Sequence, residues 1–384
     1  MGQKILIKNG RIIDPARGID QTGSVLTDGS RIAEYSEAAA MDAEQVFDAT
    51  GCIVTPGLID FHIHLARHIT DAGVLPDVMG LPNGITAAVD QGSCGTANIE
   101  GFIRHTVASS EMTLRAFLNV SAIGVTTERH PENPDPATWD TDRIAYLFDQ
   151  YPGFLLGLKL RMGKGFSTGW GIKTLEAALK ISGQIQKPLC VHLTNSELPY
   201  EDIVSLLRPG DILCHCYQGI GDYTILGKGT SGSVIDAVRE ARKRGVLFDV
   251  ASGRINYNIK VMQAAFADGF LPDIISTDAV STSVYNHKLF HLLFVLSRHF
   301  AMGTALIDAL RCCTAAPARL MGLEGKIGTL APGSQADIAV FRLRDKPVLF
   351  KDREGNELEG KLLLIPQLTV HKGRVAYAQM DFVF

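Results

Sequence analysis

The chain has 384 residues, of which 46% are hydrophobic and 20% are charged, and its formal net charge is −4 at pH 7. This length accommodates one large domain and a smaller one, and the apolar content provides an ample core. The small net charge gives no support for nucleic acid or an anionic membrane as a partner. The sequence also lacks a run of about eighteen apolar residues, which argues against a membrane-spanning helix.

The first 56 residues predict short strands separated by tight turns. The strands are expected at 4–8, 11–13, 24–27, 31–35 and 45–48, with a turn at Lys8-Asn9-Gly10. The C-terminal stretch, residues 326–384, shows the same alternation of apolar and polar residues. Neither stretch could bury a sheet face alone, so we expect both ends to fold together into one small β-sandwich domain, residues 1–56 plus 326–384.

Between the two ends, strand-like and helix-like patterns alternate over residues 57–325. Strands are predicted at 58–65, 85–91, 114–121, 154–162, 188–194, 211–217, 246–251 and 274–278, and helices at 172–186, 233–244 and 304–315. This α/β order predicts a (β/α)8 TIM-like barrel. The alternative, an open doubly wound sheet, would usually carry a glycine-rich phosphate loop after its first strand, and this sequence has none there.

Side chains that can bind metal occur near the ends of the predicted strands. His62 and His64 are two residues apart, so in a strand they project from one face and form half of a metal site. His192, His215 and Asp278 follow near the ends of later strands. Because the chemistry of a barrel lies at the C-terminal ends of its strands, these side chains are expected to converge.

Lys159 lies within the apolar fourth strand and has two interpretations. Facing outward, it would bury its stem and keep its ammonium in water. Facing inward beside metals, it would lose its proton, and the neutral amine could react with carbon dioxide to form a carbamate that bridges two ions. By strand parity, Lys159 and Arg161 share a face.

Together these residues resemble the amidohydrolase superfamily. The resemblance begins with Pro56-Gly57-Leu58-Ile59-Asp60-Phe61-His62-Ile63-His64 and ends with 328–340, the return into the sandwich domain, and it spans essentially the whole chain. The internal motifs are most similar to the amidohydrolase/deacetylase branch, often labelled dihydroorotase-like; they are 157–162, 214–216, 248–250 and 275–278.

The resemblance implies a binuclear metal centre, most simply of zinc. It places His62, His64 and Asp278 on one ion and His192 and His215 on the other, with a carbon dioxide-derived carbamate on Lys159 bridging them. Two such metals would lower the pKa of a bridging water, and the hydroxide would attack an amide or ester carbonyl. Asp278 would accept the proton and deliver it to the leaving group.

Other residues near these motifs have more than one interpretation. Arg161 either binds a substrate carboxylate or forms a salt bridge at the barrel rim. Cys94 resembles a metal-bridging cysteine of D-aminoacylases, but Lys159 already fills that role, so a bystander is favoured. Cys214 and Cys216 are expected on the face opposite His215, packed against helices. The glycine-rich stretch 219–232 is either a mobile lid or an ordinary surface loop.

Two stretches near the mouth depart from the pattern of the branch. Ala251-Ser252-Gly253 stands where a Gly-His-Gly is expected, and Ala279-Val280 stands where a histidine often follows the aspartate. Leu65-Ala66-Arg67-His68 also lacks the arginine-containing signature of true dihydroorotases. The substrate of the branch therefore does not transfer to this chain.

The leading interpretation is a binuclear metal-dependent hydrolase that deacylates a small N-acyl or O-acyl carboxylate. The enzymatic alternatives are a cyclic amidohydrolase of the dihydroorotase or hydantoinase kind and a nucleobase deaminase, against which Lys159 counts. The non-enzymatic alternative is an assembly scaffold. We expect a small-molecule substrate and a homo-oligomer, without nucleic acid or membrane partners. The odd number of cysteines, seven, and the lack of a secretory signal predict reduced thiols in the cytoplasm.

Overall fold

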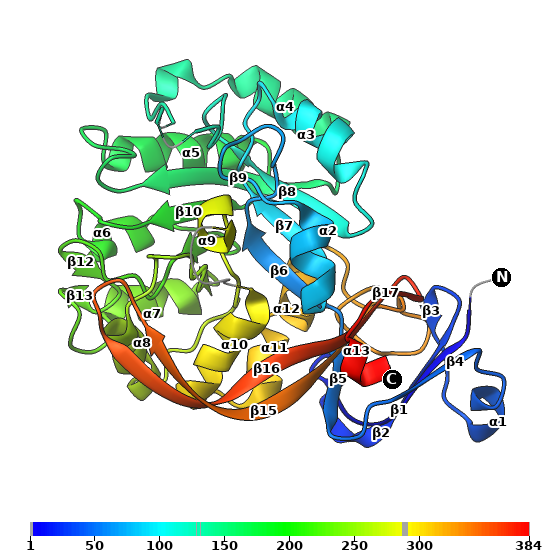
Figure 1. Cartoon of the computed structure of the whole chain (residues 1–384). Coiled ribbons are helices and arrows are strands. Elements are labelled where there is room, and N and C mark those ends of the chain that lie inside the picture. The colour runs from blue at the N-terminus through cyan, green and yellow to red at the C-terminus, as the bar shows by residue number, and fades with distance from the viewer. Residues whose placement is uncertain (1–2, 128, 131, 286–290, 384) are drawn as a thin grey trace.

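The computed structural model describes residues 3–127, 129–130, 132–285 and 291–383 (Figure 1). Residues 1, 2 and 384 of the predicted composite domain lie outside this range. Two large sheets organise the chain. One is an all-parallel sheet of seven strands, and the other is a mixed sheet of eight strands that combines both ends of the chain.

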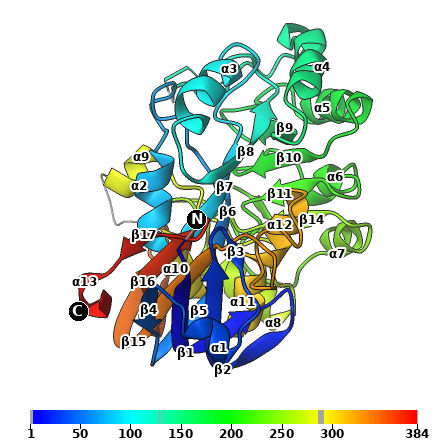
Figure 2. The same cartoon turned by 90° about the vertical axis from the view of Figure 1, so that its right-hand side faces the viewer.

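The mixed sheet has the order β17-β16-β15-β5-β1-β2-β3, and β4 pairs with β1. Its strands are β1 (Ile5–Asp14), β2 (Ile19–Asp28), β3 (Arg31–Ile32), β4 (Gln45–Asp48), β5 (Cys52–Pro56), β15 (Ile338–Lys351), β16 (Glu357–His371) and β17 (Arg374–Ala378). Figure 2 shows the N-terminal strands lying beside β15 and β16. The antiparallel pairing of β5 with β15 joins the two ends, as the sequence predicts.

The predicted turn at Lys8-Asn9-Gly10 is wrong, because β1 continues through it. Asn9 adopts a φ of 63°, and the register with β2 shifts between Ile7 and Gly10, which identifies a β-bulge. A Cβ at Gly10 would lie 2.4 Å from the Val54 side chain, so the bulge needs a glycine to let β1 approach β5. The local Asn-Gly signal therefore marks an irregularity inside one strand.

The parallel sheet has the order β14-β11-β10-β9-β8-β7-β6. Its strands are β6 (Leu58–Ile63), β7 (Ile85–Gln91), β8 (Thr113–Asn119), β9 (Leu155–Met162), β10 (Leu189–Leu193), β11 (Ile212–Cys214) and β14 (Leu247–Asp249), and they confirm seven of the predicted strands. The predicted eighth, 274–278, forms isolated bridges from Ile274 to β14 and from Ala279 to β6. This segment thus bonds to both edge strands of the sheet.

Helices follow most of the parallel strands and cover the outside of that sheet (Figure 1). They are α2 (Pro76–Gly80), α3 (Ile99–Phe102), α4 (Thr141–Gln150), α5 (Ile172–Gln184), α6 (Tyr200–Val204), α7 (Asp236–Lys243), α8 (Ile259–Ala267), α9 (Ser281–Tyr285), α10 (Leu292–Ala301), α11 (Leu306–Arg311) and α12 (Ala315–Leu320). The α5 helix shows the pattern: Leu175, Ala178 and Ile181 recur on one buried face. This face packs against the strands and confirms the predicted helix at 172–186.

The remaining elements are short. They are α1 (Glu37–Ala40), α13 (Met380–Val383), the 3₁₀ turns Leu81–Asn83 and Pro136–Thr138, a π-helical turn at Ile103–Val107, and the hairpin β12 (Tyr223–Thr224) and β13 (Gly227–Lys228). This hairpin lies in the glycine-rich stretch 219–232. Within the described residues, no helix is long and apolar enough to cross a membrane.

The β15–β16 ribbon extends far beyond the mixed sheet. It runs under α10 and ends beside α8, on the side of the molecule opposite the termini (Figure 1). The Leu364 amide of the ribbon donates to Ser297 Oγ of α10, at 3.0 Å. The C-terminal ribbon therefore packs against a helix of the parallel-sheet unit.

Candidate metal centre

The six predicted ligands come from five places along the parallel sheet. His62 lies in β6 and His64 directly follows it, Lys159 lies in β9 and His192 in β10, His215 follows β11, and Asp278 lies in the segment 274–279. All six side chains are buried. The structure brings them together at the C-terminal ends of the strands, where the sequence places them.

His62, His64 and Asp278 form one group of potential ligands. Their candidate ligand atoms all lie within 4.8 Å of one another. The Nε2 atoms of His62 and His64 lie 3.5 and 3.4 Å from Asp278 Oδ1. Two imidazole nitrogens and one carboxylate oxygen are a donor set that suits zinc.

His192 and His215 form a second group. His215 Nε2 lies 2.7 Å from His192 Nδ1, and the two rings are nearly perpendicular, with centroids 4.4 Å apart. The opposite nitrogens are engaged elsewhere: His215 Nδ1 lies 2.7 Å from the carbonyl oxygen of Ala251, and His192 Nε2 lies 2.8 Å from Thr194 Oγ1. Each histidine therefore directs its other nitrogen toward the common space.

Lys159 faces the interior, beside the first group. Its Nζ lies 3.4 Å from His62 Nε2. A Cβ at Gly92, which has a φ of 73°, would lie 2.5 Å from Lys159 Cβ, so this glycine makes room for the lysine stem. The outward-facing interpretation of Lys159 is thereby excluded.

The prediction for Cys214 is wrong. Its thiol points inward, 3.4 Å from Lys159 Nζ and 3.0 Å from Cys190 Sγ. The reason is that His215 has a φ of 61°, which breaks the alternation of the strand, so Cys214 and His215 both reach the interior. Cys216 packs in the apolar layer that contains the helices, as predicted.

The charges of the site favour metal ligands. Burial lowers the pKa of His62 and His192 well below the ordinary value and that of His215 to about 3, so the imidazoles are neutral near pH 7. Burial would raise the pKa of Asp278, but a hydrogen bond from His64 holds it below the ordinary value. Neutral histidines beside a carboxylate are ready to bind a cation without losing protons.

The protonation of Lys159 depends on its surroundings. Burial lowers its pKa, whereas Cys190, Cys214 and Asp278 raise it, and the net pKa lies above the ordinary value. Divalent cations beside Nζ would oppose this ammonium and favour the neutral amine. The protonation state of Lys159 is therefore sensitive to any cation that binds beside it.

Several residues that orient the ligands were not singled out from the sequence. Asp249 Oδ2 lies 3.0 Å from His62 Nδ1, and Ser93 Oγ lies 2.8 Å from His64 Nδ1. Asp249 Oδ1 also accepts a hydrogen bond from Ser276 Oγ at 2.5 Å. Such partners fix the ring orientation of metal-binding histidines. Cys214, Asp249 and His62 are also close enough to form a ligand group, but Asp249 meets the His62 nitrogen that faces away from Asp278.

All of the predicted ligands except His215 line a cavity of about 270 Å³. Arg161, Phe166, Asn195, Ile220 and Asn256 are among its other lining residues. The position of Arg161 is compatible with both of its predicted roles, since it lines the cavity and also forms a salt bridge. Its NH1 lies 3.0 Å from Glu132 Oε2, and its guanidinium lies 3.8 Å from the centre of the Phe166 ring. Ile220 brings the glycine-rich stretch 219–232 to the mouth.

Cys94 belongs to neither ligand group. Its side chain is fully buried in the apolar core, and burial raises the pKa of its thiol. Asn256, by contrast with Cys94, contacts a proposed ligand directly, since its Nδ2 donates to Asp278 Oδ2 at 2.8 Å. The first interpretation of Cys94, as a ligand, is therefore not supported by its position.

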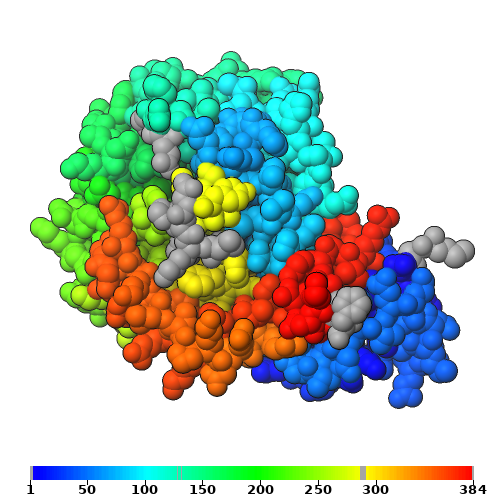
Figure 3. Space-filling view, viewed as in Figure 1, coloured from blue at the N-terminus to red at the C-terminus, as the bar shows by residue number. Residues whose placement is uncertain are grey.

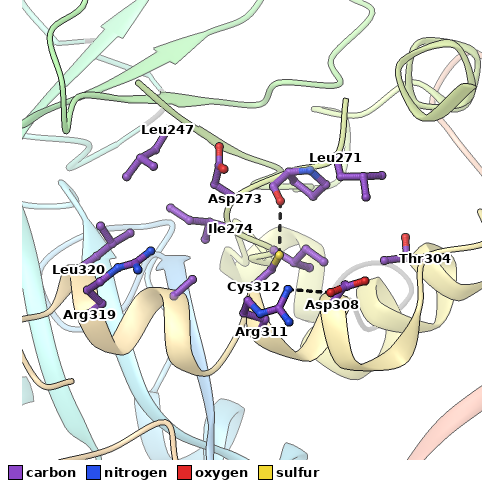
Figure 4. A pocket seen from close by; sticks show the side chains of 13 residues that line it. Leu247, Leu271, Asp273, Ile274, Thr304, Asp308, Arg311, Cys312, Arg319 and Leu320 are labelled. Atoms are coloured by element: carbon purple, nitrogen blue, oxygen red, sulfur yellow. Dashed lines mark hydrogen bonds and ion pairs between the residues drawn. The ribbon is translucent and has the colours of Figure 1, made fainter. Parts of the chain in front are cut away.

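A larger cavity of about 430 Å³ lies elsewhere, lined by Leu247, Ile274, Cys312 and Arg319 among others (Figure 4). Its Arg311 pairs with Asp308 at 2.7 Å, and the Cys312 thiol donates to the carbonyl oxygen of Pro272. None of the predicted ligands lines this cavity. The chemistry therefore belongs to the smaller cavity.

The sequence is similar to those of several known proteins. The sequence profile of the amidohydrolase family matches residues 53–360. A deacetylase of Agrobacterium fabrum is 29% identical over 370 residues, covering 95% of this chain and 90% of the relative. A deacetylase of Enterococcus faecalis is 26% identical over 377 residues, covering 98% of this chain and 99% of the relative.

Solved structures of the same architecture include an adenine deaminase and a dihydroorotase. The adenine deaminase superposes with a TM-score of 0.86 at 25% identity and covers 98% of this chain and 100% of its own. The dihydroorotase superposes with a TM-score of 0.87 at 28% identity, and the match covers 97% of this chain and 99% of the dihydroorotase chain. One fold thus hosts several reactions, so the reaction must be argued from the site.

Proposed function

Because the chain belongs to the amidohydrolase family and is a hydrolase, we propose that it is a binuclear metal-dependent enzyme that deacylates a small N-acyl or O-acyl carboxylate. The observation that carries this proposal is the convergence of six buried side chains, five of which line one cavity while His215 contacts it through His192. His62, His64 and Asp278 would hold one ion, and His192 and His215 the other. When bound, two divalent ions, most simply zinc, supply a water of lowered pKa and polarise a carbonyl oxygen.

Lys159 would link the two halves of the site as a carbamate. Its Nζ lies 3.4 Å from His62 Nε2. His192 lies on the neighbouring strand β10, and its partner His215 follows β11, the next strand of the sheet. A carbamate has two anionic oxygens, so it would replace a buried cation with a bridging anion. This change would also offset part of the charge of two divalent ions in a buried site.

Asp278 is the general acid and base of this proposal. It is held as a carboxylate by His64, and Asn256 fixes its other oxygen. It would accept a proton from water and return it to the leaving group. Arg161, which lines the cavity and is held by Glu132, would bind the substrate carboxylate through its remaining donors.

The proposal includes the arrangement of the domains. Residues 57–325 would form a closed (β/α)8 barrel, and 1–56 with 326–384 a composite β-sandwich in a cytoplasmic protein. Support for closure comes from backbone hydrogen bonds of the segment 274–279 to both edge strands, Val250 to Ile274 and Asp278 to His62. The mixed sheet has its own core, which includes Ile7, Val54 and Ile338.

A cyclic amidohydrolase is the second candidate, because the dihydroorotase structure superposes over nearly the whole chain. The stretch after His64, Leu65-Ala66-Arg67-His68, favours deacylation over ring opening of a pyrimidine. A nucleobase deaminase would need one ion, and an assembly scaffold would need none. Metal content therefore separates these possibilities.

The test is metal content by mass spectrometry on protein prepared with bicarbonate. Wild type should hold about two ions per chain, and Lys159→Ala should lose most of them. Lys173→Ala is the matched control, since it removes an exposed lysine in α5. One ion in all three proteins would contradict the bridging role of Lys159, and no metal after reconstitution would favour the scaffold. N-acyl and O-acyl acids should then be screened for hydrolysis.

A further inference from the structure

The mouth of the candidate site is strongly cationic. Four side chains that line the cavity beyond the proposed ligands are basic: Arg161, Lys164, Arg254 and Arg353. Among the residues that the structure describes, the one carboxylate that lines it is Asp278, which belongs to the ligand set. Glu132 offsets the charge of Arg161. Within the described part of the chain, Lys164 and Arg353 form no ion pair, so their charge is available to a ligand.

Arg353 differs from the other three because it comes from the C-terminal ribbon. It lies at the exposed turn between β15 and β16, about 75 residues beyond Asp278 in the sequence. Figure 3 shows the orange tip of the ribbon at the rim of the parallel-sheet unit, beside its green segments. The composite sheet therefore supplies a charge to a cavity that is otherwise built from residues 62–282.

Hydrogen bonds from one loop hold the tip of the ribbon in place. The Tyr257 hydroxyl donates to the carbonyl oxygen of Lys351 at 2.6 Å, and the Ile259 amide donates to Asp352 Oδ2 at 2.8 Å. Asn258 Nδ2 lies 3.4 Å from Glu354 Oε2. These three contacts bracket Arg353 on both sides.

The turn between β15 and β16 is also stabilised by hydrogen bonds within it, and Tyr257, which holds it, packs against α10. Asp352 accepts hydrogen bonds from the backbone amide and the side-chain amide of Asn356, both at 2.8 Å. The buried Arg298 guanidinium of α10 lies 3.7 Å from the centre of the Tyr257 ring. A long side chain on a fixed backbone loses less entropy on binding than one on a loose loop.

We propose that Arg353 is a specificity residue that binds a carboxylate at the end of the substrate remote from the scissile acyl bond. The inference rests on the proposed function and narrows its substrate to acyl compounds with a second negative charge. Arg161 is deeper and partly neutralised, whereas the Arg353 guanidinium offers a fork of donors to a carboxylate. Arg254 and Lys164 add positive charge on the same rim.

The first test measures binding without turnover. Glutarate and glutaramate differ only in one end group, carboxylate against amide, and calorimetry with the metal-loaded protein gives their relative affinities. Wild type should bind glutarate about tenfold to a hundredfold more tightly. Arg353→Gln should reduce this ratio to less than about threefold, whereas Arg344→Gln, the same charge change on an exposed position of β15, should keep it.

The second test measures hydrolysis of N-acetylglutamate and N-acetylglutamine. Arg353→Gln should raise KM for the charged substrate with little change in kcat, because the contact is remote from the reacting atoms. The role of Arg353 would be overturned if wild type hydrolysed both substrates with equal kcat/KM. It would also be overturned if Arg353→Gln and Arg344→Gln showed the same ratio of glutarate to glutaramate affinity. A glutarate preference that Arg353→Gln removes, in a protein that hydrolyses neither substrate, would support Arg353 and contradict deacylation instead.

Discussion

At the scale of single residues, the candidate centre depends on hydrogen bonds that occupy one nitrogen of each histidine. Asp249, Ser93, Thr194 and the carbonyl oxygen of Ala251 engage the ring nitrogens that face away from the other ligands. Each contact selects a ring orientation before any ion binds. The donor atoms are thus positioned by groups that need not touch a metal.

A substitution at Gly253 would test whether the position of the Asp278 carboxylate matters for activity. Its φ is 51°, and a Cβ there would lie 2.5 Å from Asp278 Oδ2 and 3.0 Å from Asn256 Nδ2. Gly253→Ala should displace the carboxylate and lower kcat/KM by about a hundredfold, as a misplacement near 1 Å does. Steady-state kinetics of the metal-loaded variant would measure the loss.

The control for this prediction is Gly269→Ala. Gly269 has a φ of 71°, but no atom of the described residues lies within 4 Å of its Cβ position. Both variants carry a backbone penalty of about 1 kcal/mol, and only Gly253→Ala adds the clash with Asp278. Equal activity in the two variants would show that the Asp278 position is not critical.

Strand parity explains which site residues could be predicted. Lys159 and His192 lie where regular strands place them, whereas the register of β6 shifts between Asp60 and Ile63 and Asp278 has a φ of 50°. Cys214 was misplaced because the positive φ of His215 is not visible in the sequence. Asp249 was missed as an orienting group because its partner, His62, lies 187 residues away.

At the scale of elements, α10 buries an unusual pair of polar residues. Arg298 and His299 are fully buried, and within the described residues neither ring nitrogen of His299 has a hydrogen-bond partner. Burial, and then the neighbouring Arg298, lower the pKa of His299 well below its ordinary value of 6.5. The helix therefore holds a histidine that must stay neutral in the folded chain.

This burial makes the stability of the fold sensitive to acid. A depressed folded-state pKa means that the unfolded chain binds the proton more readily, so stability is complete above pH 6.5 and is lost as pH falls below it. Relative to wild type, His299→Leu should gain about 1.5 to 2 kcal/mol between pH 6.5 and pH 5. Urea unfolding at the two pH values would measure this difference.

His105→Leu is the matched control, because His105 is exposed on the π-helical turn Ile103–Val107. It should show the same pH dependence as wild type. The buried histidines of the metal site also resist protonation, so only the difference between variants is diagnostic. A His299→Leu curve parallel to wild type would contradict the prediction.

Strand boundaries could be predicted from local sequence patterns where the hydrogen bonding between strands is regular. The strand at 85–91 was predicted to the residue: it follows Gly84 in a left-handed turn, and it is buried throughout. The segment 274–279 was predicted as a regular strand, but it alternates its hydrogen bonds between two neighbours and carries Asp278 with a φ of 50°. That irregularity is imposed by the tertiary structure.

At the scale of the whole molecule, the two ends of the chain do more than close a sheet. The sequence predicts that they pair, because neither end could bury a sheet face alone. It could not predict that β15 and β16 extend to the mouth, because the contacts of Tyr257 with Lys351 and of Ile259 with Asp352 span more than 90 residues. Such contacts have no local pattern that marks them.

The proposed ions would link several strands of the parallel sheet, since their ligands lie in or next to β6, β9, β10, β11 and the segment 274–279. Ions that bind only the folded chain stabilise it by about 4 kcal/mol per site at a thousandfold excess over Kd. Chelation should therefore lower Tm by an amount on the order of 10 °C. Scanning calorimetry of the loaded and the chelated protein would measure it.

Two histidines near β6 give this last prediction its control. His64→Ala removes a proposed ligand, and His68→Ala removes an exposed histidine four residues later. His64→Ala should lose about half of the Tm shift that chelation causes, because one of two sites is damaged, while His68→Ala should keep all of it. If chelation strips the metal and Tm does not change, the ions do not join these strands, and the ligand set proposed here is wrong.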